Sequence, residues 1–267
     1  MSDPDEREVI DVGRPNAARM YDYYLGGSAN FEVDRAAAEA GRAAMPDAET
    51  YARANRAFLG RAVRYLCSVG IDQFLDLGSG IPTKGNVHEI AQGVNPRARV
   101  AYVDIESVAV AHSRRMLAQV DGVTITRADI RRPEVVLSAP GVAGQLDFDR
   151  PIAVLAVAIL PFVPDDVEAA AVLAAYRQAC APGSYLAISH ISQLAASAEQ
   201  VAAAEQVMAR TPTPVKWRSA DRIAPLLDGY EIVPPGLLPV PLWRPDGPVE
   251  PEQVVRANAF GAVGVLR

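Results

Sequence analysis

Short apolar runs alternate with helical stretches through the middle of the chain. The runs are strand-sized and lie at residues 73–78, 98–104, 123–129, 151–159 and 183–191. The stretches between them carry apolar residues at helical spacing and lie at 86–94, 107–120 and 165–180. Strands that alternate with helices predict right-handed crossovers, and therefore an α/β fold with a mostly parallel sheet and helices on both faces. Unbroken apolar runs such as IAVLAVAI fit a sheet that is buried on both sides.

The N-terminal part of the chain has a different pattern. Residues 1–15 are polar, and we expect them to form a mobile tail. Residues 16–70 predict a helical cap, whose first helix would end at the Gly26–Gly27 pair. Two further helices are predicted near 33–44 and 47–69, the second with its apolar positions on one face.

The C-terminal part completes the predicted sheet domain, which we assign to residues 71–267. Pro and Gly are dense between 211 and 251, where residues 230–243 read as a strand pair interrupted by prolines. Residues 254–267 contain a last strand. A final hairpin that closes one edge of the sheet would fit this pattern.

Length and charge narrow the class of protein. The chain has 267 residues, of which 50% are hydrophobic, enough for one large domain with a sizeable core. Its net charge of −6 argues against a nucleic-acid partner, because phosphate binding requires clustered Lys and Arg.

The cysteines and the apolar runs exclude other classes. Cys67 and Cys180 lie far apart and outside any metal-binding spacing, so we expect no metal site and two small buried hydrophobes. The polar, acidic N-terminus does not resemble a secretory leader. No run approaches the ~20 apolar residues of a membrane span. We therefore expect a cytoplasmic protein without a membrane partner, and leave the oligomeric state open.

The motif FLDLGSGIPTKGNVHEI suggests a nucleotide-binding turn. In an open parallel sheet, ligands bind at the carboxyl ends of the strands, where Gly78, Ser79 and Gly80 would lie. Glycines there let the backbone turn sharply and let a ligand approach it closely. A dinucleotide fingerprint would have a third glycine, but this chain has Thr83 there, preceded by Pro82, which lacks an amide donor. The turn is therefore a weak candidate for a pyrophosphate.

Three acids at successive strand ends favour a cationic adenosine ligand instead. Asp76 precedes the turn, where it would repel a phosphate but suit the sulfonium and ammonium groups of S-adenosylmethionine. Asp104 ends the second strand, where it can accept the ribose hydroxyls, and Ile105 can pack on the adenine. Asp129 ends the third strand, where it can accept the adenine amino group. Each acid alone could be a helix cap.

These motifs carry a family resemblance. DLGSG, YVDIES, ADI and PIAVLAVAIL resemble class I S-adenosylmethionine-dependent methyltransferases. More narrowly, NAARMYDYYLGGSANFEVDR, RANRAFLGRAVRYL, APGSYLAISH and VPLWRPD resemble an actinobacterial methyltransferase-like family formerly described as a domain of unknown function, DUF574. The resemblance covers almost the whole chain. It implies a Rossmann-like, seven-stranded sheet with an antiparallel last strand and a helical cap over the cofactor.

The resemblance also implies cofactor contacts. These are at Gly78, Ser79, Gly80, Asp104, Ile105, Asp129 and Ile130, and we add Ala158 in the fourth strand segment. Relatives tend to have Leu-His-Phe where this chain has Leu160-Pro161-Phe162, which puts a histidine base at that position in doubt.

Further candidates come from the cap and from the other strand ends. Arg19 could pair with the cofactor carboxylate, or instead with a structural Asp, and Tyr24 could close over the methionine end. His190 ends the fifth strand and is the best-placed general base, although a histidine satisfied by neighbouring backbone is an equal alternative. Trp217 and Trp243 could line an acceptor pocket or serve as packing anchors.

The sequence leaves three functions open. The leading hypothesis is a methyltransferase that uses S-adenosylmethionine, releases S-adenosylhomocysteine, and acts on a small-molecule acceptor. The second is a non-catalytic protein that binds these ligands in a regulatory or partner role, which the proline at 161 keeps open. The third, a nicotinamide-dependent oxidoreductase, is disfavoured by Pro82 and Asp76.

Overall fold

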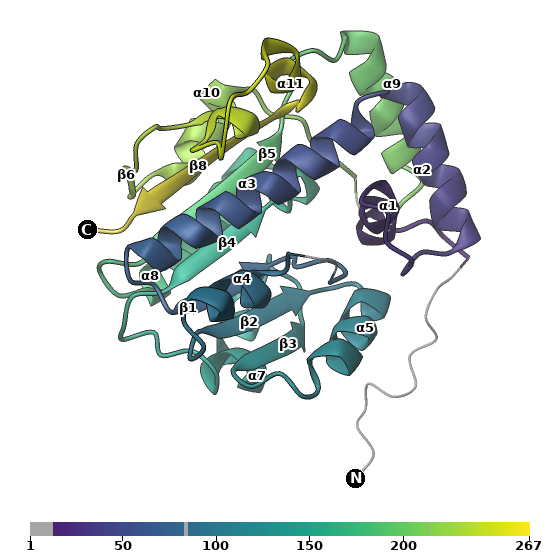
Figure 1. Cartoon of the computed structure of the whole chain (residues 1–267). Helices are drawn as coiled ribbons and strands as arrows, with labels where there is room; N and C mark the ends of the chain where they lie inside the picture. The colour runs from purple at the N-terminus through teal and green to yellow at the C-terminus, as the bar shows by residue number, and fades with distance from the viewer. Residues whose placement is uncertain (1–12, 83–84, 213) are drawn as a thin grey trace.

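One mixed sheet organises the chain (Figure 1). A computed structural model describes residues 13–82, 85–212 and 214–267, and within these ranges eight strands form the sheet in the order β3-β2-β1-β4-β5-β8-β6, with β7 also paired to β8. The strands are β1 (Gln73–Leu77), β2 (Arg99–Asp104), β3 (Val123–Arg127), β4 (Ala153–Val157), β5 (Tyr185–Ile191), β6 (Glu231–Ile232), β7 (Leu238–Pro239) and β8 (Ala259–Val265).

The strand directions match the predicted α/β pattern. Strands β1 to β5 are parallel, because a helical segment returns the chain between each pair. Strand β8 is antiparallel to β5, and β6 and β7 are antiparallel to β8. The expected mostly parallel sheet with an antiparallel last strand is therefore confirmed.

The strand count differs from the prediction of seven. Residues 230–243 contribute two separate short strands, β6 and β7, which pair with different parts of β8. Pro234 and Pro235 between them carry no amide hydrogen, so this stretch cannot run as one continuous ladder along β8. The sheet consequently has eight strands in the part of the chain that the structure describes.

Helices cover both faces of the sheet. The α-helices are α1 (Ala17–Tyr24), α2 (Glu32–Ala44), α3 (Ala48–Ser68), α4 (Val87–Val94), α5 (Ser107–Leu117), α6 (Pro133–Ser138), α7 (Pro140–Ala143), α8 (Asp166–Ala179), α9 (Ala198–Met208), α10 (Ala220–Ile223) and α11 (Pro251–Arg256). The 3-10 helices are η2 (Leu160–Phe162), η3 (Ala224–Leu227) and η4 (Val240–Leu242). None of the helices in the described part combines the length and apolar character needed to cross a membrane.

The core lies in two layers, one on each face of the sheet. Phe74 of β1 belongs to a buried cluster with Phe58 of α3, whereas its neighbour Leu75 belongs to a second cluster with Tyr176 of α8. Side chains alternate between the faces of a strand, so β1 must be apolar on both. This explains the continuous apolar runs in the sequence.

The three helices predicted between residues 16 and 70 are present as α1, α2 and α3. Figure 1 shows α1 and α2 gathered with α9 beyond the carboxyl ends of the parallel strands, while α3 runs across one face of the sheet. Helix α9, which the sequence pattern did not predict, packs against α2. The division into a tail, a cap and a sheet domain stays a prediction, and residues 1–12 of the tail lie outside the described residues.

Candidate functional site

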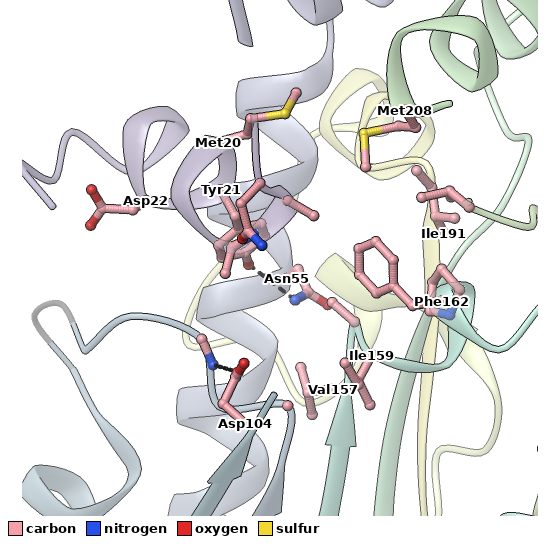
Figure 2. A pocket seen from close by; sticks show the side chains of 18 of the residues that line it. Met20, Tyr21, Asp22, Asn55, Asp104, Val157, Ile159, Phe162, Ile191 and Met208 are labelled. Carbon is pink, nitrogen blue, oxygen red and sulfur yellow. Dashed lines mark hydrogen bonds between the residues drawn. The ribbon is translucent and has the colours of Figure 1, made fainter. Parts of the chain in front are cut away.

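The parallel register brings the strand ends and the glycine turn together. Leu77 of β1 lies opposite Val103 of β2, one residue before Asp104. The Gly78 and Ser79 amides donate to the Val103 carbonyl, at 2.8 and 3.0 Å. The Gly80 amide then donates to Asp104 Oδ2 at 2.6 Å (Figure 2). The turn after β1 is therefore tied to the end of β2.

The two glycines of the turn have left-handed backbones but different surroundings. Gly78 has φ +70°, and a Cβ there would lie 2.3 Å from Ile159 Cδ1. Gly80 has φ +65°, and a Cβ there would meet no described atom within 4 Å. Between them, the buried Ser79 hydroxyl makes no hydrogen bond to any described residue. The turn thus leaves open space at Gly80 that a ligand can fill, beside a buried hydroxyl whose hydrogen-bonding capacity is unused.

The amides that a pyrophosphate would use are already occupied. The Glu89 carboxylate accepts from the Gly85 and Asn86 amides, at 2.8 and 2.9 Å, where α4 begins. A helix start that carries its own anion does not attract a second one. The occupied amides agree with the prediction, made from Pro82, that this turn does not bind a diphosphate. Thr83, the other residue of that argument, lies outside the described residues.

A cavity of about 280 Å³ lies between the strand ends, the cap and α9. This is near the lower end of the range for small-molecule sites. Every residue predicted to bind the cofactor lines it except Arg19: Tyr24, Gly78, Ser79, Gly80, Asp104, Ile105, Asp129, Ile130 and Ala158. The structure therefore brings residues from four strand ends and the cap to one cavity.

The carboxylates at the strand ends have different pKa values. Burial raises the pKa of Asp76 to about 7, against the opposing charge of Arg56 and with a small contribution from Asp104. Burial also raises the pKa of Asp104, although the Glu106 and Gly80 amides that donate to it act in the other direction. Two buried acids side by side make this end of the cavity suited to a cation.

The environment of Asp129 differs from that of Asp76 and Asp104. Its carboxylate is paired with the Arg131 guanidinium, with 2.6 Å between Oδ2 and Nη2. Partial burial alone would raise the pKa of Asp129, but the hydrogen bonds and charge of Arg131 outweigh it, and the pKa is lowered. The Asp129 carboxylate is thus ionised and already has one partner at the cavity wall.

Arg19 has the structural partners that the sequence offered as its alternative. It is 2% exposed and donates to Asp34 of α2 at 2.8 Å and to Glu106 at 3.0 Å. Glu106 caps α5, since its carboxylate accepts from the Ala109 amide at 2.6 Å. Arg19 therefore joins the cap to the start of α5, and it does not line the cavity.

His190 also lies away from the cavity. It is 0% exposed, its Nδ1 donates to the Ile191 carbonyl at 2.7 Å, and its Nε2 accepts from Arg218 at 2.8 Å. Burial lowers its pKa to about 4, so the ring is neutral, but both nitrogens are engaged. We therefore correct the expectation of a general base: the residue is a histidine satisfied by its surroundings.

A network of hydrogen bonds along the cavity wall was not predicted from the sequence. Tyr21 of α1 donates to the Ala52 carbonyl at 3.0 Å and accepts from Asn55 Nδ2 at 3.1 Å (Figure 2). Asn55 Oδ1 accepts from the Ser189 hydroxyl, which in turn accepts from the Ala158 amide at 3.0 Å. Ala158 has φ +59°, an unfavourable backbone for a residue with a Cβ. This network of hydrogen bonds fixes the strained Ala158 relative to the cap.

The fold and the site define a class of protein. A mostly parallel sheet, a glycine turn after β1, and acids at the ends of β1 and β2 under a helical cap are the features of a class I methyltransferase-like protein.

Comparison with known proteins gives the family. The model of the S-adenosyl methyltransferase family matches residues 3–267, and the chain belongs to this family. It is an S-adenosylmethionine-dependent methyltransferase, and S-adenosylmethionine is its cofactor. No curated protein matches the chain.

Solved structures agree with this assignment. A candidate methyltransferase from Thermobifida fusca YX is 38% identical, with 97% of each chain covered and a TM-score of 0.90. A DUF574 family protein from Streptomyces avermitilis MA-4680 is 33% identical over 97% of this chain and 100% of that one, with a TM-score of 0.92. The N-methyltransferase NodS from Bradyrhizobium japonicum WM9, solved with S-adenosylhomocysteine, shares the fold at 12% identity, with 93% and 98% covered and a TM-score of 0.51.

The different surroundings of the two glycines predict different effects of alanine. Gly80→Ala should fold, at a cost of about 1–2 kcal/mol for the left-handed backbone, and should bind S-adenosylhomocysteine at least tenfold more weakly because the Cβ enters the cavity. Gly78→Ala should lose far more stability, since its Cβ meets Ile159. Thermal unfolding and calorimetric titration measure the two effects.

Gly93→Ala is the matched control, because Gly93 lies in α4 with no atom within 4 Å of its Cβ position and an ordinary backbone. It should change stability by less than about 1 kcal/mol and leave binding unchanged. Wild-type affinity in Gly80→Ala would contradict a ligand at the turn.

Proposed function

We propose that this cavity binds S-adenosylmethionine and that the methyl acceptor is a small molecule. The observation that carries the proposal is the Ser79 hydroxyl, buried and without a partner among the described residues, beside the open space at Gly80. A buried polar group without a hydrogen bond costs about 1–3 kcal/mol. A bound polar ligand would remove this cost once the Ser79 side chain rotates toward the cavity that the residue lines.

The residues around the turn suit the parts of this cofactor. Asp104 would accept the ribose hydroxyls with the lone pairs that its contacts with backbone amides leave free. Ile105 is 55% exposed, unusual for a large apolar side chain at a cavity, and would cover the adenine. Asp129 and Ile130 would complete the adenine contacts. Asp76 would lie near the positive charges.

The chemistry of the bound cofactor is simple. It presents a methyl group on a positively charged sulfur, which keeps the electron pair of the broken bond when an acceptor lone pair takes the methyl group. The chain's own contribution is to hold both molecules in place and to exclude water, which can supply most of the rate. Arg19 would contribute by holding the cap over the cavity, not by touching the cofactor.

The walls of the cavity support a small acceptor. Residues of α1, α2, α3 and α9 surround it on the side away from the strand ends. A macromolecular acceptor would have to insert a side chain or base through these walls. A cytoplasmic location and the lack of a nucleic-acid or membrane partner stay predictions from the sequence.

The ribose role of Asp104 gives the first test. Asp104→Ala should weaken S-adenosylhomocysteine binding by at least a hundredfold in calorimetric titration, and Asp104→Asn by about tenfold or more, because charge-assisted hydrogen bonds contribute about 1.5–3 kcal/mol. Asp121→Ala, an exposed acid in the turn before β3, should bind like the wild type.

The same titration tests the function. Binding of S-adenosylmethionine and S-adenosylhomocysteine without binding of NAD supports the proposal. Unchanged affinity in Asp104→Ala would remove Asp104 from the ribose role. Binding of NAD alone would overturn the proposed function.

The raised pKa of Asp76 gives a pH dependence. A cationic ligand favours the ionised carboxylate, whose pKa in the free protein is about 7. At pH 6 most Asp76 carboxyl groups are protonated and must lose the proton when the cation binds, whereas at pH 8 most are already ionised. The affinity for S-adenosylmethionine should therefore rise about tenfold from pH 6 to pH 8 and level off above pH 8.

Asp76→Asn removes the titrating group while it keeps the shape. Its affinity should be lower at pH 8 and nearly constant over the same pH window. An equal pH dependence in both proteins would show that another group is responsible.

A further inference from the structure

The end of the cavity under the cap is distinct from the end at the glycine turn. We propose that this end is the acceptor subsite and that it takes an uncharged, planar aromatic small molecule. The proposal rests on the proposed function, since it assigns the other end of the same cavity to the cofactor. We call this part the acceptor chamber and define it by Met20, Met45, Tyr51, Phe162, Met208 and Trp217.

The chamber walls come from segments far apart in the sequence. Met20 and Met45 belong to the cap region, Phe162 to η2, and Met208 to the end of α9. Figure 2 shows Phe162, Ile191 and Met208 on one side of the cavity and Asp104 on the other. The acceptor chamber therefore lies apart from the acid that would hold the ribose.

The side chains of the chamber suit an aromatic molecule. Aromatic rings offer flat apolar surfaces that favour offset-stacked or edge-to-face contacts with another ring. Methionine side chains are flexible and polarizable, so they can pack against aromatic rings of different shapes. Their sulfur atoms also make favourable contacts with ring edges. Met20, Met45 and Met208 are three of the five methionines of the chain, a concentration that a plain packing role does not require.

Charged groups are placed away from the chamber. The acids and guanidinium groups Asp76, Asp104, Asp129, Arg56 and Arg131 belong to the strand-end side, where Arg56 acts on the charge of Asp76. Asp22 is the charged residue of α1 that reaches the cavity wall, and its carboxylate accepts from the Ala29 amide and Asn30 Nδ2, at 2.9 and 2.8 Å. In Figure 2 Asp22 points away from Met208 and Phe162. A charged acceptor would lose its hydration in the chamber without gaining a partner.

Two tyrosines, Tyr24 and Tyr51, contribute titratable groups to the cavity wall at this end. The Tyr24 hydroxyl donates to the Ala38 carbonyl at 2.9 Å, and burial raises its pKa to about 12. Burial also raises the pKa of Tyr51, whose hydroxyl makes no hydrogen bond to the described residues. Neither group accepts a proton near neutral pH. The chamber thus suits a nucleophile with no proton to lose, such as a heteroaromatic nitrogen, with Tyr51 free to donate to one polar atom of the ring.

The test uses two fluorescent probes that share one ring system. N-phenyl-1-naphthylamine is uncharged, and 8-anilinonaphthalene-1-sulfonate carries a sulfonate on the same skeleton. Titrated into the full chain saturated with S-adenosylhomocysteine, the uncharged probe should bind at one site, with a Kd at least tenfold below that of the sulfonate. Binding in the presence of S-adenosylhomocysteine shows that the two ligands occupy different parts of the cavity.

Two variants locate the probe. Met208→Glu places a carboxylate in the chamber at a half-buried helix end, where folding tolerates it, and should weaken binding of the uncharged probe at least tenfold. Val167→Glu, at a position 79% exposed on α8, should leave probe binding unchanged. Both variants should bind S-adenosylhomocysteine within twofold of the wild type.

The outcomes separate this inference from the proposed function. If S-adenosylhomocysteine itself does not bind, the proposed function fails and the chamber loses its role with it. If it binds while the uncharged probe is displaced, binds no better than the sulfonate, or binds equally to Met208→Glu, the function stands and the acceptor chamber is wrong.

Discussion

The register of the parallel strands is the constraint on which the site depends. Five strands that run in one direction must end at one edge of the sheet, so the turn after β1 meets the end of β2. The Gly80 amide bound to Asp104 is the local result of that register. A slip of one residue would turn Asp104 to the other face and separate it from the turn. The position of the proposed cofactor site therefore follows from the strand register of the sheet.

The cap is fixed to this edge by buried charges. Arg19, held between Asp34 and Glu106, spans from the first helix of the cap to the start of α5. Buried pairs of this kind do not reliably add stability, but the loss of one partner is costly because it leaves a charge without compensation. The pair consequently specifies where the cap sits. A second set of hydrogen bonds, from Tyr21 through Asn55 to Ser189, joins α1 and α3 to β5.

The sequence predicted the parts of the structure that rest on local chemistry. The alternation of apolar runs and helices gave the sheet, and Gly78, Gly80 and Asp104 met at its edge because parallel strand ends must do so. What it could not predict depends on contacts between distant residues. Arg19 and His190 each had a catalytic or ligand-binding alternative, and only the positions of Asp34 and Arg218 in space decide between them. Helix α9 has no buried residue, because the apolar side that carries Ala204, Val207 and Met208 lines the cavity and does not pack into the core.

The central claim is that the cavity holds the adenosine of the cofactor at the glycine turn. A crystal structure of the protein with S-adenosylhomocysteine tests it most directly. The account predicts that the ribose hydroxyls lie within hydrogen-bond distance of the Asp104 carboxylate, that the adenine packs against Ile105, and that Ser79 gains a polar partner. A ligand bound elsewhere, or a ribose held by other residues while Asp104 keeps only its amide contacts, would contradict the account.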